Sequence, residues 1–245
     1  MENNYFWIGG KHAVTNAYLN KNRKIKEILL SNENNSKLLD HSKLIKITKK
    51  ESIDKIFKDP NFIHQGFAAL IEKIENPKLE LFLKEKKDQP LTLLILNELQ
   101  DDRNIGSIIR SSVAFDVDGI IFGKRDFRSK SHEMYKTASG AMEHVNVFLV
   151  SNLSNAIRTL KENDVWVYAL DSESNQSLYE QDFTKKTAFV FGSEGFGIKD
   201  LVKKNCNEII KIPISEKVES LNVSNTVASV LSFHSFKQKK PPRLL

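Results

Sequence analysis

The feature that most constrains the fold is a six-residue run, Leu91-Thr92-Leu93-Leu94-Ile95-Leu96, which is apolar on both faces. A strand points successive side chains to opposite faces, so a half-buried strand alternates polar and apolar residues. An unbroken apolar run is instead expected of a central strand in a parallel sheet, which helices cover on both sides. The run therefore predicts an α/β domain built around a parallel sheet.

Further apolar segments downstream have the length of neighbouring strands in the same sheet. They occupy residues 119–122, 165–170, 187–191 and 209–214. Segments with helical periodicity separate them, which is the alternation typical of a doubly wound sheet. We therefore expect one α/β domain from residue 91 to residue 245.

The first third of the chain shows the same alternation on a smaller scale. Its periodicity predicts helices at 11–20 and 51–58, and strands at 25–30, 44–47 and 66–70. Residues 84–90 are charged, lack apolar side chains apart from the closing proline, and are the best candidate for a linker. The predicted organisation is a small α/β domain at 1–83, a linker at 84–90 and a second domain at 91–245.

The basic residues are unevenly distributed between these parts. The formal net charge is +6, and residues 1–90 hold 17 Lys and Arg against 12 Asp and Glu. Residues 91–245 hold 20 against 19, and four of those 20 lie in the terminal tail, at Lys237, Lys239, Lys240 and Arg243. A basic excess is the footprint of a surface that binds polyanions such as nucleic acid. Solvated Lys-rich helices explain the excess equally well, so charge alone does not decide.

The composition disfavours several classes of protein. No apolar run approaches the length of a membrane span, and residues 1–5 lack the layout of a secretory signal. The single cysteine, Cys206, excludes an internal disulfide framework, and the six histidines lack metal-ligand spacing. We therefore expect a cytoplasmic protein without a metal or a membrane anchor, in which Cys206 is a small, partly buried residue.

Three segments of the second domain place polar residues and glycines directly after apolar strands, at the edge where α/β sheets bind ligands. In the first, Asn104 is suited to cap a helix and Gly106 permits close approach of a ligand or chain. Arg110 follows between one and two helical turns later and offers a planar fork suited to phosphate. A surface arginine on a capped helix also accounts for this segment.

The other two segments are as ambiguous when each is taken alone. Gly192-Ser193-Glu194-Gly195-Phe196-Gly197 indicates a turn whose backbone faces a ligand, or simply a tight strand-to-helix turn. Its glycine spacing differs from the dinucleotide-binding fingerprint. In the last segment a strand ends at 212–214 and a helix begins near Ser224, so Ser220 and Asn222 are either helix caps or the wall of a polar pocket.

Taken together, the three motifs resemble the SpoU (TrmH-type) family of RNA ribose methyltransferases. The pattern is Asn-x-Gly-x-x-x-Arg at 104–110, Gly-Ser-Glu-Gly-x-Gly at 192–197, and Ile-Pro-Ile followed by Ser-Leu-Asn-Val-Ser within 212–224. Three further segments, at 10–14, 64–67 and 138–144, resemble the RlmB type, which methylates a guanosine ribose in 23S ribosomal RNA. The resemblance covers nearly the whole chain.

The resemblance implies a fold, a cofactor and an assembly. Members of the family fold the catalytic domain as an α/β sheet with a deep trefoil knot, a feature otherwise almost absent from proteins. The knot forms the pocket for S-adenosylmethionine, and the enzymes act as homodimers through the knotted region. Carried over by motif, four residues would hold the cofactor: Leu170, Gly192, Ile212 and Leu221.

The same resemblance implies a catalytic set of five residues: Asn104, Arg110, Glu194, Ser220 and Asn222. A sulfonium methyl is already activated, so the protein has to place the 2′-oxygen and remove its proton. The family proposal makes Arg110 the base, or the group that orients the hydroxyl. A guanidinium is effectively never neutral in proteins, so a clamp on an RNA phosphate presents less physical difficulty.

The N-terminal domain resembles the family's substrate-binding domain, a small α/β fold related to ribosomal RNA-binding proteins. Its basic excess supports that role independently. Four basic residues are expected to contact ribosomal RNA: Lys11, Lys124, Arg125 and Arg128. The alternative for those that follow the strand at 119–122 is plain solvated loop charge.

Three positions depart from the common family pattern. Asn97-Glu98 stands where members often have Asp-Gly, Asp102 where a proline is common, and Asp116 where glycine is frequent. These departures put the local route of the backbone in question, but they leave the cofactor motifs intact.

Two rival functions stay open. One is a transfer-RNA ribose methyltransferase, against which the separate N-terminal domain argues, because the simplest transfer-RNA members lack it. The other is a non-catalytic RNA-binding factor in ribosome assembly, against which the intact Arg110, Glu194 and Asn222 argue.

Overall fold

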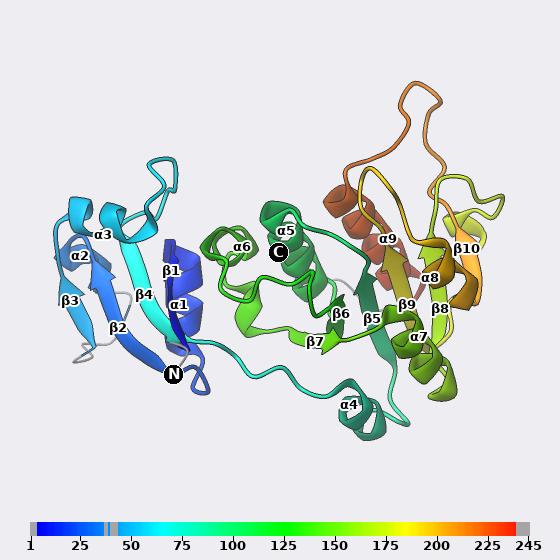
Figure 1. Ribbon diagram of the computed structural model, residues 1–245, viewed down its shortest axis with the longest axis horizontal. Coiled ribbons are helices and arrows are strands. Elements are labelled where there is room, and N and C mark those ends of the chain that lie inside the picture. The colour runs from blue at the N-terminus through cyan, green and yellow to red at the C-terminus, as the bar shows by residue number, and fades with distance from the viewer. Residues whose placement is uncertain (1–3, 37–38, 40–43, 239–245) are drawn as a thin grey trace. The chain divides into compact units, whose positions relative to one another are not determined.

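The computed structural model describes residues 4–36, 39 and 44–238, and the chain forms two compact units. The first unit comprises residues 1–75 together with 105–110 and 128–144, and the second comprises 76–104, 111–127 and 145–245. Each unit is built around its own sheet (Figure 1). The basic residues Lys239, Lys240 and Arg243 lie outside the described part of the chain.

The sheet of the first unit has four strands in the order β1-β4-β2-β3. β4 (Phe67–Glu72) runs antiparallel to β1 (Tyr5–Gly9) and β2 (Ile25–Leu30), and β3 (Ile45–Ile47) runs parallel to β2. The helices are α1 (Lys11–Leu19), α2 (Glu33–Ser36), α3 (Lys50–Phe57) and α6 (His132–Ala138), with a 3₁₀ turn η1 (Ala141–Glu143). The helices and strands predicted between residues 11 and 70 are confirmed with slightly shifted ends, whereas β1 and α2 were not predicted.

A buried ion pair ties the segment 128–144 to the strands of the first unit. The Arg23 Nη2 and Nε atoms donate to Glu143 Oε1 and Oε2 at 2.6 and 3.0 Å, and both side chains are only 1% exposed. Arg23 Nη1 donates to the carbonyl of Glu72, and Asn20 Nδ2 donates to Glu143 Oε2. Burial lowers the pKa of Arg23, but the hydrogen bonds and charge of Glu143 outweigh burial and the net shift is upward.

The sheet of the second unit has six strands in the order β10-β8-β9-β5-β6-β7, and all neighbours are parallel. The strands are β5 (Leu91–Leu96), β6 (Gly119–Gly123), β7 (Asn146–Val150), β8 (Trp166–Leu170), β9 (Lys186–Phe191) and β10 (Glu208–Ile210). The helices are α4 (Leu79–Glu85), α7 (Leu153–Glu162), α8 (Asp200–Asn205) and α9 (Val223–Lys237), with a 3₁₀ turn η2 (Leu178–Glu180). The residues of a further helix, α5 (Asp102–Ala114), are divided between the two units. The predicted α/β class with a parallel sheet is confirmed.

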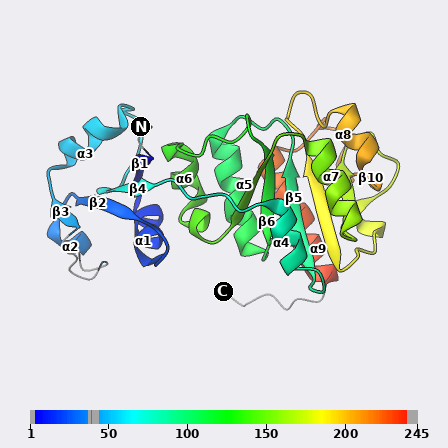
Figure 2. The same ribbon diagram turned by 60° about the horizontal axis from the view of Figure 1, so that its bottom comes forward.

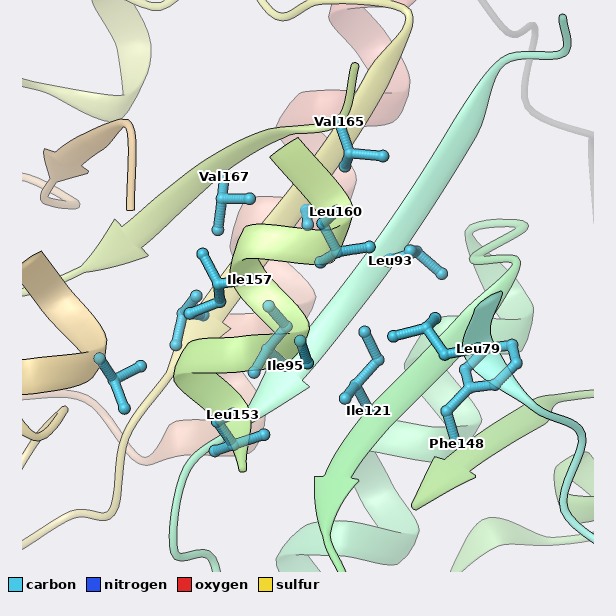
Figure 3. Packing of buried hydrophobic residues seen from close by; sticks show 14 of the residues in the cluster. Leu79, Leu93, Ile95, Ile121, Phe148, Leu153, Ile157, Leu160, Val165 and Val167 are labelled. Carbon is cyan, nitrogen blue, oxygen red and sulfur yellow. The ribbon is translucent and has the colours of Figure 1, made fainter. Parts of the chain in front are cut away.

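Helices cover both faces of this sheet, as the apolar run at 91–96 predicts. On one face α7 buries residues spaced four and three apart, Leu153, Ile157 and Leu160, among the strand side chains (Figure 3). Helices α4 and α8 contribute to the same cluster. Helix α9 lies on the opposite face (Figure 2). Its His234 packs against Phe189 of β9, with ring centroids 5.2 Å apart. None of the helices within the described ranges is both long and apolar enough to cross a membrane.

Two local predictions are corrected by the structure. β10 ends at Ile210 rather than 214, because Pro213 lacks an amide for the ladder and only Lys211 forms a further bridge. Asn104 does not cap α5; Asp101 does, accepting from two backbone amides. The close approach expected at Gly106 is that of a neighbouring segment, α6, since an added Cβ would lie 2.7 Å from the Met134 carbonyl oxygen. β7 was not predicted, and α4 ends at Glu85, just inside the residues expected to form a linker.

Two of the three departures from the family pattern coincide with unusual backbone conformations. Glu98 and Asp116 have φ values of 57° and 54°, in the left-handed region that favours glycine. At both positions the backbone therefore adopts a conformation that glycine takes without strain, although neither residue is glycine.

Candidate functional site

A cavity of about 420 Å³ opens at the carboxyl ends of β8 and β9 in the second unit. In parallel α/β sheets this edge is the usual place for ligands. The cavity wall includes every residue predicted to hold the cofactor, Leu170, Gly192, Ile212 and Leu221, and two of the predicted catalytic residues, Glu194 and Ser220. We call it the cofactor cavity.

The segment that follows β9 forms a tight hairpin beside this cavity. Ser193 and Gly197 exchange two backbone hydrogen bonds, with N···O distances of 3.2 and 2.9 Å. A Cβ built on Gly192 would overlap the backbone of Gly197 and Ile198, so a larger residue would push the hairpin open. The hairpin exposes Glu194 and Phe196 at its tip.

The three motifs meet at one oxygen of the Glu194 carboxylate. Its Oε1 accepts from Asn222 Nδ2 at 2.6 Å, from Asn104 Nδ2 at 3.2 Å and from the backbone amide of Val223 at 3.2 Å. Asn222 Nδ2 also lies 3.1 Å from Asn104 Oδ1. Within the described part of the chain, Oε2 of Glu194 has no hydrogen-bond partner. The start of α5, the hairpin and the start of α9 are thereby joined.

The wall of the cofactor cavity contains an ion pair between an aspartate and a lysine. Lys203 Nζ lies 2.7 Å from Asp171 Oδ2, and both residues line the cavity. Burial raises the pKa of Asp171, but hydrogen bonds from Lys203 and the Glu173 amide outweigh it, so the pKa is lowered overall. The hydrogen bond to Asp171 raises the pKa of Lys203. The cavity therefore carries an ionised carboxylate at neutral pH.

Comparison with known proteins decides the family. A sequence model of the SpoU rRNA Methylase family matches residues 91–232. The chain belongs to the SpoU family. A relative from Staphylococcus saprophyticus subsp. saprophyticus is 35% identical over 95% of both chains, and one from Bacillus subtilis is 32% identical over 98% of this chain and 99% of its own. The names of both relatives place them among TrmH family tRNA/rRNA methyltransferases.

Solved structures share the SpoU fold with this chain. The SpoU methyltransferase AviRb from Streptomyces viridochromogenes, in complex with AdoMet, has a TM-score of 0.82 at 16% identity, covering 97% of this chain and 91% of its own. An RNA 2′-O ribose methyltransferase has a TM-score of 0.79 at 17% identity, covering 96% and 89%. The A. aeolicus TrmH/SpoU tRNA modifying enzyme covers 68% of this chain and 90% of its own, with a TM-score of 0.56 at 21% identity.

The remaining predicted residues are not part of the cluster around Glu194. Arg110 lies on α5 six residues after Asn104, is exposed, and forms no hydrogen bond or ion pair with any residue the structure describes. Of the residues expected to contact RNA, two lie in the first unit and two in the second, and all are exposed: Lys11, Arg128, Lys124 and Arg125.

Sequence reasoning missed part of the site of this SpoU protein. Asp171 directly follows β8, in the same position relative to its strand as the recognised motifs, so the same rule could have found it. Lys203 gave no signal, because a helical lysine is ordinarily solvated. No group of three or more His, Cys, Asp or Glu that could hold a metal ion occurs among the described residues. Burial raises the pKa of the Cys206 thiol to about 12, so it is unreactive at neutral pH.

Proposed function

We propose that this protein transfers a methyl group from S-adenosylmethionine to the ribose 2′-hydroxyl of a guanosine in 23S ribosomal RNA. The observation that carries the proposal is the convergence of three sequence-distant motifs on Glu194 Oε1, beside the cavity at the carboxyl ends of β8 and β9. AviRb, which has the same fold, binds AdoMet, and another protein of this fold is an RNA 2′-O ribose methyltransferase.

The cofactor cavity fits S-adenosylmethionine in its chemistry. Leu170, Ile212 and Leu221 offer apolar walls, and the absence of a side chain at Gly192 lets a ligand approach the hairpin backbone. The ionised Asp171 is suited to accept hydrogen bonds from ribose hydroxyls. When bound, this cofactor supplies an electrophilic methyl group, so placement of the acceptor is the protein's main task.

The residues around Glu194 have positioning roles in this proposal. Glu194 holds the amides of Asn104 and Asn222, which fixes the first turns of α5 and α9 beside the hairpin. Arg110, without an ionic partner among the described residues, clamps the RNA phosphate next to the target ribose through its planar fork. A guanidinium stays charged, so the proton of the 2′-hydroxyl passes to another acceptor.

The first 83 residues are proposed to bind the RNA, and residues 91–245 to form the methyltransferase domain after a linker at 84–90. We also propose that the second domain contains a trefoil knot, that two copies of the protein form a homodimer through it, and that the protein acts in the cytoplasm. Ribosomal RNA is favoured over transfer RNA because the match to the tRNA modifying enzyme covers only 68% of this chain, whereas the match to an rRNA methyltransferase from Sinorhizobium meliloti covers 97%. Transfer RNA is the second candidate, because the names of the relatives include both substrates.

Labelled methyl transfer tests the proposal. Unmodified ribosomal RNA and transfer RNA are incubated separately with protein and labelled S-adenosylmethionine, and alkali-resistant linkages are mapped, since a 2′-O-methyl group prevents attack on the adjacent phosphate. We expect one resistant guanosine in 23S ribosomal RNA. Label in transfer RNA alone would move the function to the second candidate. No transfer to either RNA would refute the enzymatic proposal and favour the non-catalytic rival.

A further inference from the structure

A second cavity shares the hairpin with the cofactor cavity. It has a volume of about 390 Å³, which is within the range of small-ligand sites. Both cavities are lined by the hairpin residues from Ser193 to Phe196 and by Val223. The second cavity is otherwise lined by five residues that follow β5: Glu98, Leu99, Gln100, Asp101 and Asn104. The hairpin therefore stands between a site for the methyl donor and a neighbouring site of suitable size for its acceptor.

Phe196 presents a bare aromatic ring at this second cavity. It is 95% exposed, between Gly195 and Gly197, and forms no ring contact with another aromatic residue in the ranges described. Single exposed apolar side chains are common on proteins, so exposure alone means little. Its place between two cavities of one site is what sets it apart, because an unstacked ring is the platform on which single-stranded bases bind.

The charges of the second cavity indicate which part of a nucleotide it takes. Its described lining contains three carboxylates, Glu98, Asp101 and Glu194, and the amides of Gln100 and Asn104, but neither lysine nor arginine. Lys199 pairs with Glu98, which leaves Asp101 and Glu194 as the carboxylates of this lining without an ion pair among the described residues. These two carboxylates disfavour a phosphate, whereas a neutral base meets no such repulsion. Carboxylates only accept hydrogen bonds when ionised, and guanine offers two adjacent donors, N1–H and its exocyclic amine, on its Watson–Crick edge.

We propose that the second cavity is the subsite for the base of the target nucleotide, which leaves its stack in the RNA and stacks on Phe196. This inference rests on the proposed function, and it deepens it by naming a guanine base held by a ring and acidic groups. Phe196 is a positioning residue: it fixes the base so that the ribose of the same nucleotide reaches the donor across the hairpin. The phosphate of the same nucleotide is bound by basic residues outside the second cavity.

The test compares Phe196→Ala, Phe196→Trp and Phe236→Ala with the wild-type protein. Phe236 lies on α9, is 78% exposed and lines neither cavity, so it is a matched control. Rates of methyl transfer to unmodified 23S ribosomal RNA and the Kd for S-adenosylmethionine are measured, with sedimentation to follow the oligomeric state. Loss of one base stack should lower kcat/KM for RNA by about 5- to 150-fold in Phe196→Ala. Phe196→Trp should retain activity. Because Phe196 also lines the cofactor cavity, the Kd for S-adenosylmethionine is measured in parallel, and its change in Phe196→Ala should be much smaller than the fall in kcat/KM.

Three results would overturn the inference: wild-type kcat/KM in Phe196→Ala, an equal loss in Phe236→Ala, or a loss of S-adenosylmethionine affinity that matches the loss of kcat/KM. A changed oligomeric state in Phe196→Ala would also overturn it, because the ring would then belong to a protein interface. Absence of transfer by the wild-type protein is a separate outcome, since it removes the proposed function and this inference with it.

Discussion

The buried ion pair of Arg23 and Glu143 gives a prediction about stability that can be worked from its contacts. The Glu143 carboxylate accepts two hydrogen bonds from Arg23 and one from Asn20, and the side chains of Arg23 and Glu143 are 1% exposed. Glu143→Ala removes all three and leaves a buried guanidinium without a carboxylate partner, held by the Glu72 carbonyl and by its contact with Tyr135. Breaking a buried pair in this way costs about 3–5 kcal/mol of unfolding free energy.

A double replacement separates the loss of the pair from the presence of an unpaired charge. Arg23→Met with Glu143→Leu removes both charges, and apolar replacement of a buried pair is often near neutral. We expect this double variant to be at least about 2 kcal/mol more stable than Glu143→Ala, because the stranded guanidinium accounts for most of the single variant's loss. Arg23→Met alone should also be destabilised, since it strands the carboxylate.

The two tryptophans allow the first unit to be followed alone. Trp7 belongs to β1 and packs against the buried cluster that contains Ile53 and Phe57, whereas Trp166 belongs to β8 of the second unit. In a Trp166→Phe background, urea unfolding monitored by Trp7 fluorescence reports the free energy of the first unit. A cost below about 1 kcal/mol for Glu143→Ala, or a double variant no more stable than Glu143→Ala, would refute the reasoning.

Three predictions concern the site. Arg110→Lys keeps the charge but loses the planar fork, so methyl transfer should fall by at least about 100-fold with the calorimetric Kd for S-adenosylmethionine nearly unchanged; equal activity would rule out the clamp. Gly192→Ala should weaken S-adenosylmethionine binding at least about tenfold, because the added Cβ overlaps the hairpin backbone. Gly195→Ala is the control, since its added Cβ meets open space and it should bind the cofactor normally. Equal effects in the two variants would contradict this prediction. Asn222→Asp keeps the helix cap but replaces the donor 2.6 Å from Glu194 Oε1 with an acceptor. Turnover should therefore be lost while the thermal midpoint changes little, and wild-type turnover would count against the network.

The sequence predicted those elements whose burial can be recognised from the pattern of apolar residues adjacent in the chain. Residues 91–96 are buried along their whole length, and their unbroken apolar run predicted a central strand. β1 depends on pairing with β4, which lies about 60 residues further along the chain, and no local pattern announces such a partner. The Arg23–Glu143 pair joins residues 120 positions apart and was invisible for the same reason.

The candidate site was predicted as a set of motifs, but not as a set of contacts. Each motif named residue types suited to a turn or a cap, and the order of the three identified the family. Which atoms meet depends on how strands β5, β9 and β10 place their following loops along one sheet edge, and this is decided by the strand order. Asp171 was missed although it obeys the same rule, because a single acid after a strand is common.

The way the two helices are capped leaves the side-chain NH2 groups of Asn104 and Asn222 available to donate to Glu194. Asp101 caps α5 through Oδ1, which leaves the Asn104 amide to reach Glu194 from inside the first turn. Asn222 does both tasks at once, since its Oδ1 accepts from the Ser224 amide while its Nδ2 donates to Glu194. An amide has separate donor and acceptor atoms, so only asparagine or glutamine can cap with one and donate with the other, and asparagine is the better cap. Glu194 is therefore bound by the residues that begin α9, Asn222 and Val223, and these hydrogen bonds attach the hairpin between the two cavities to the start of that helix.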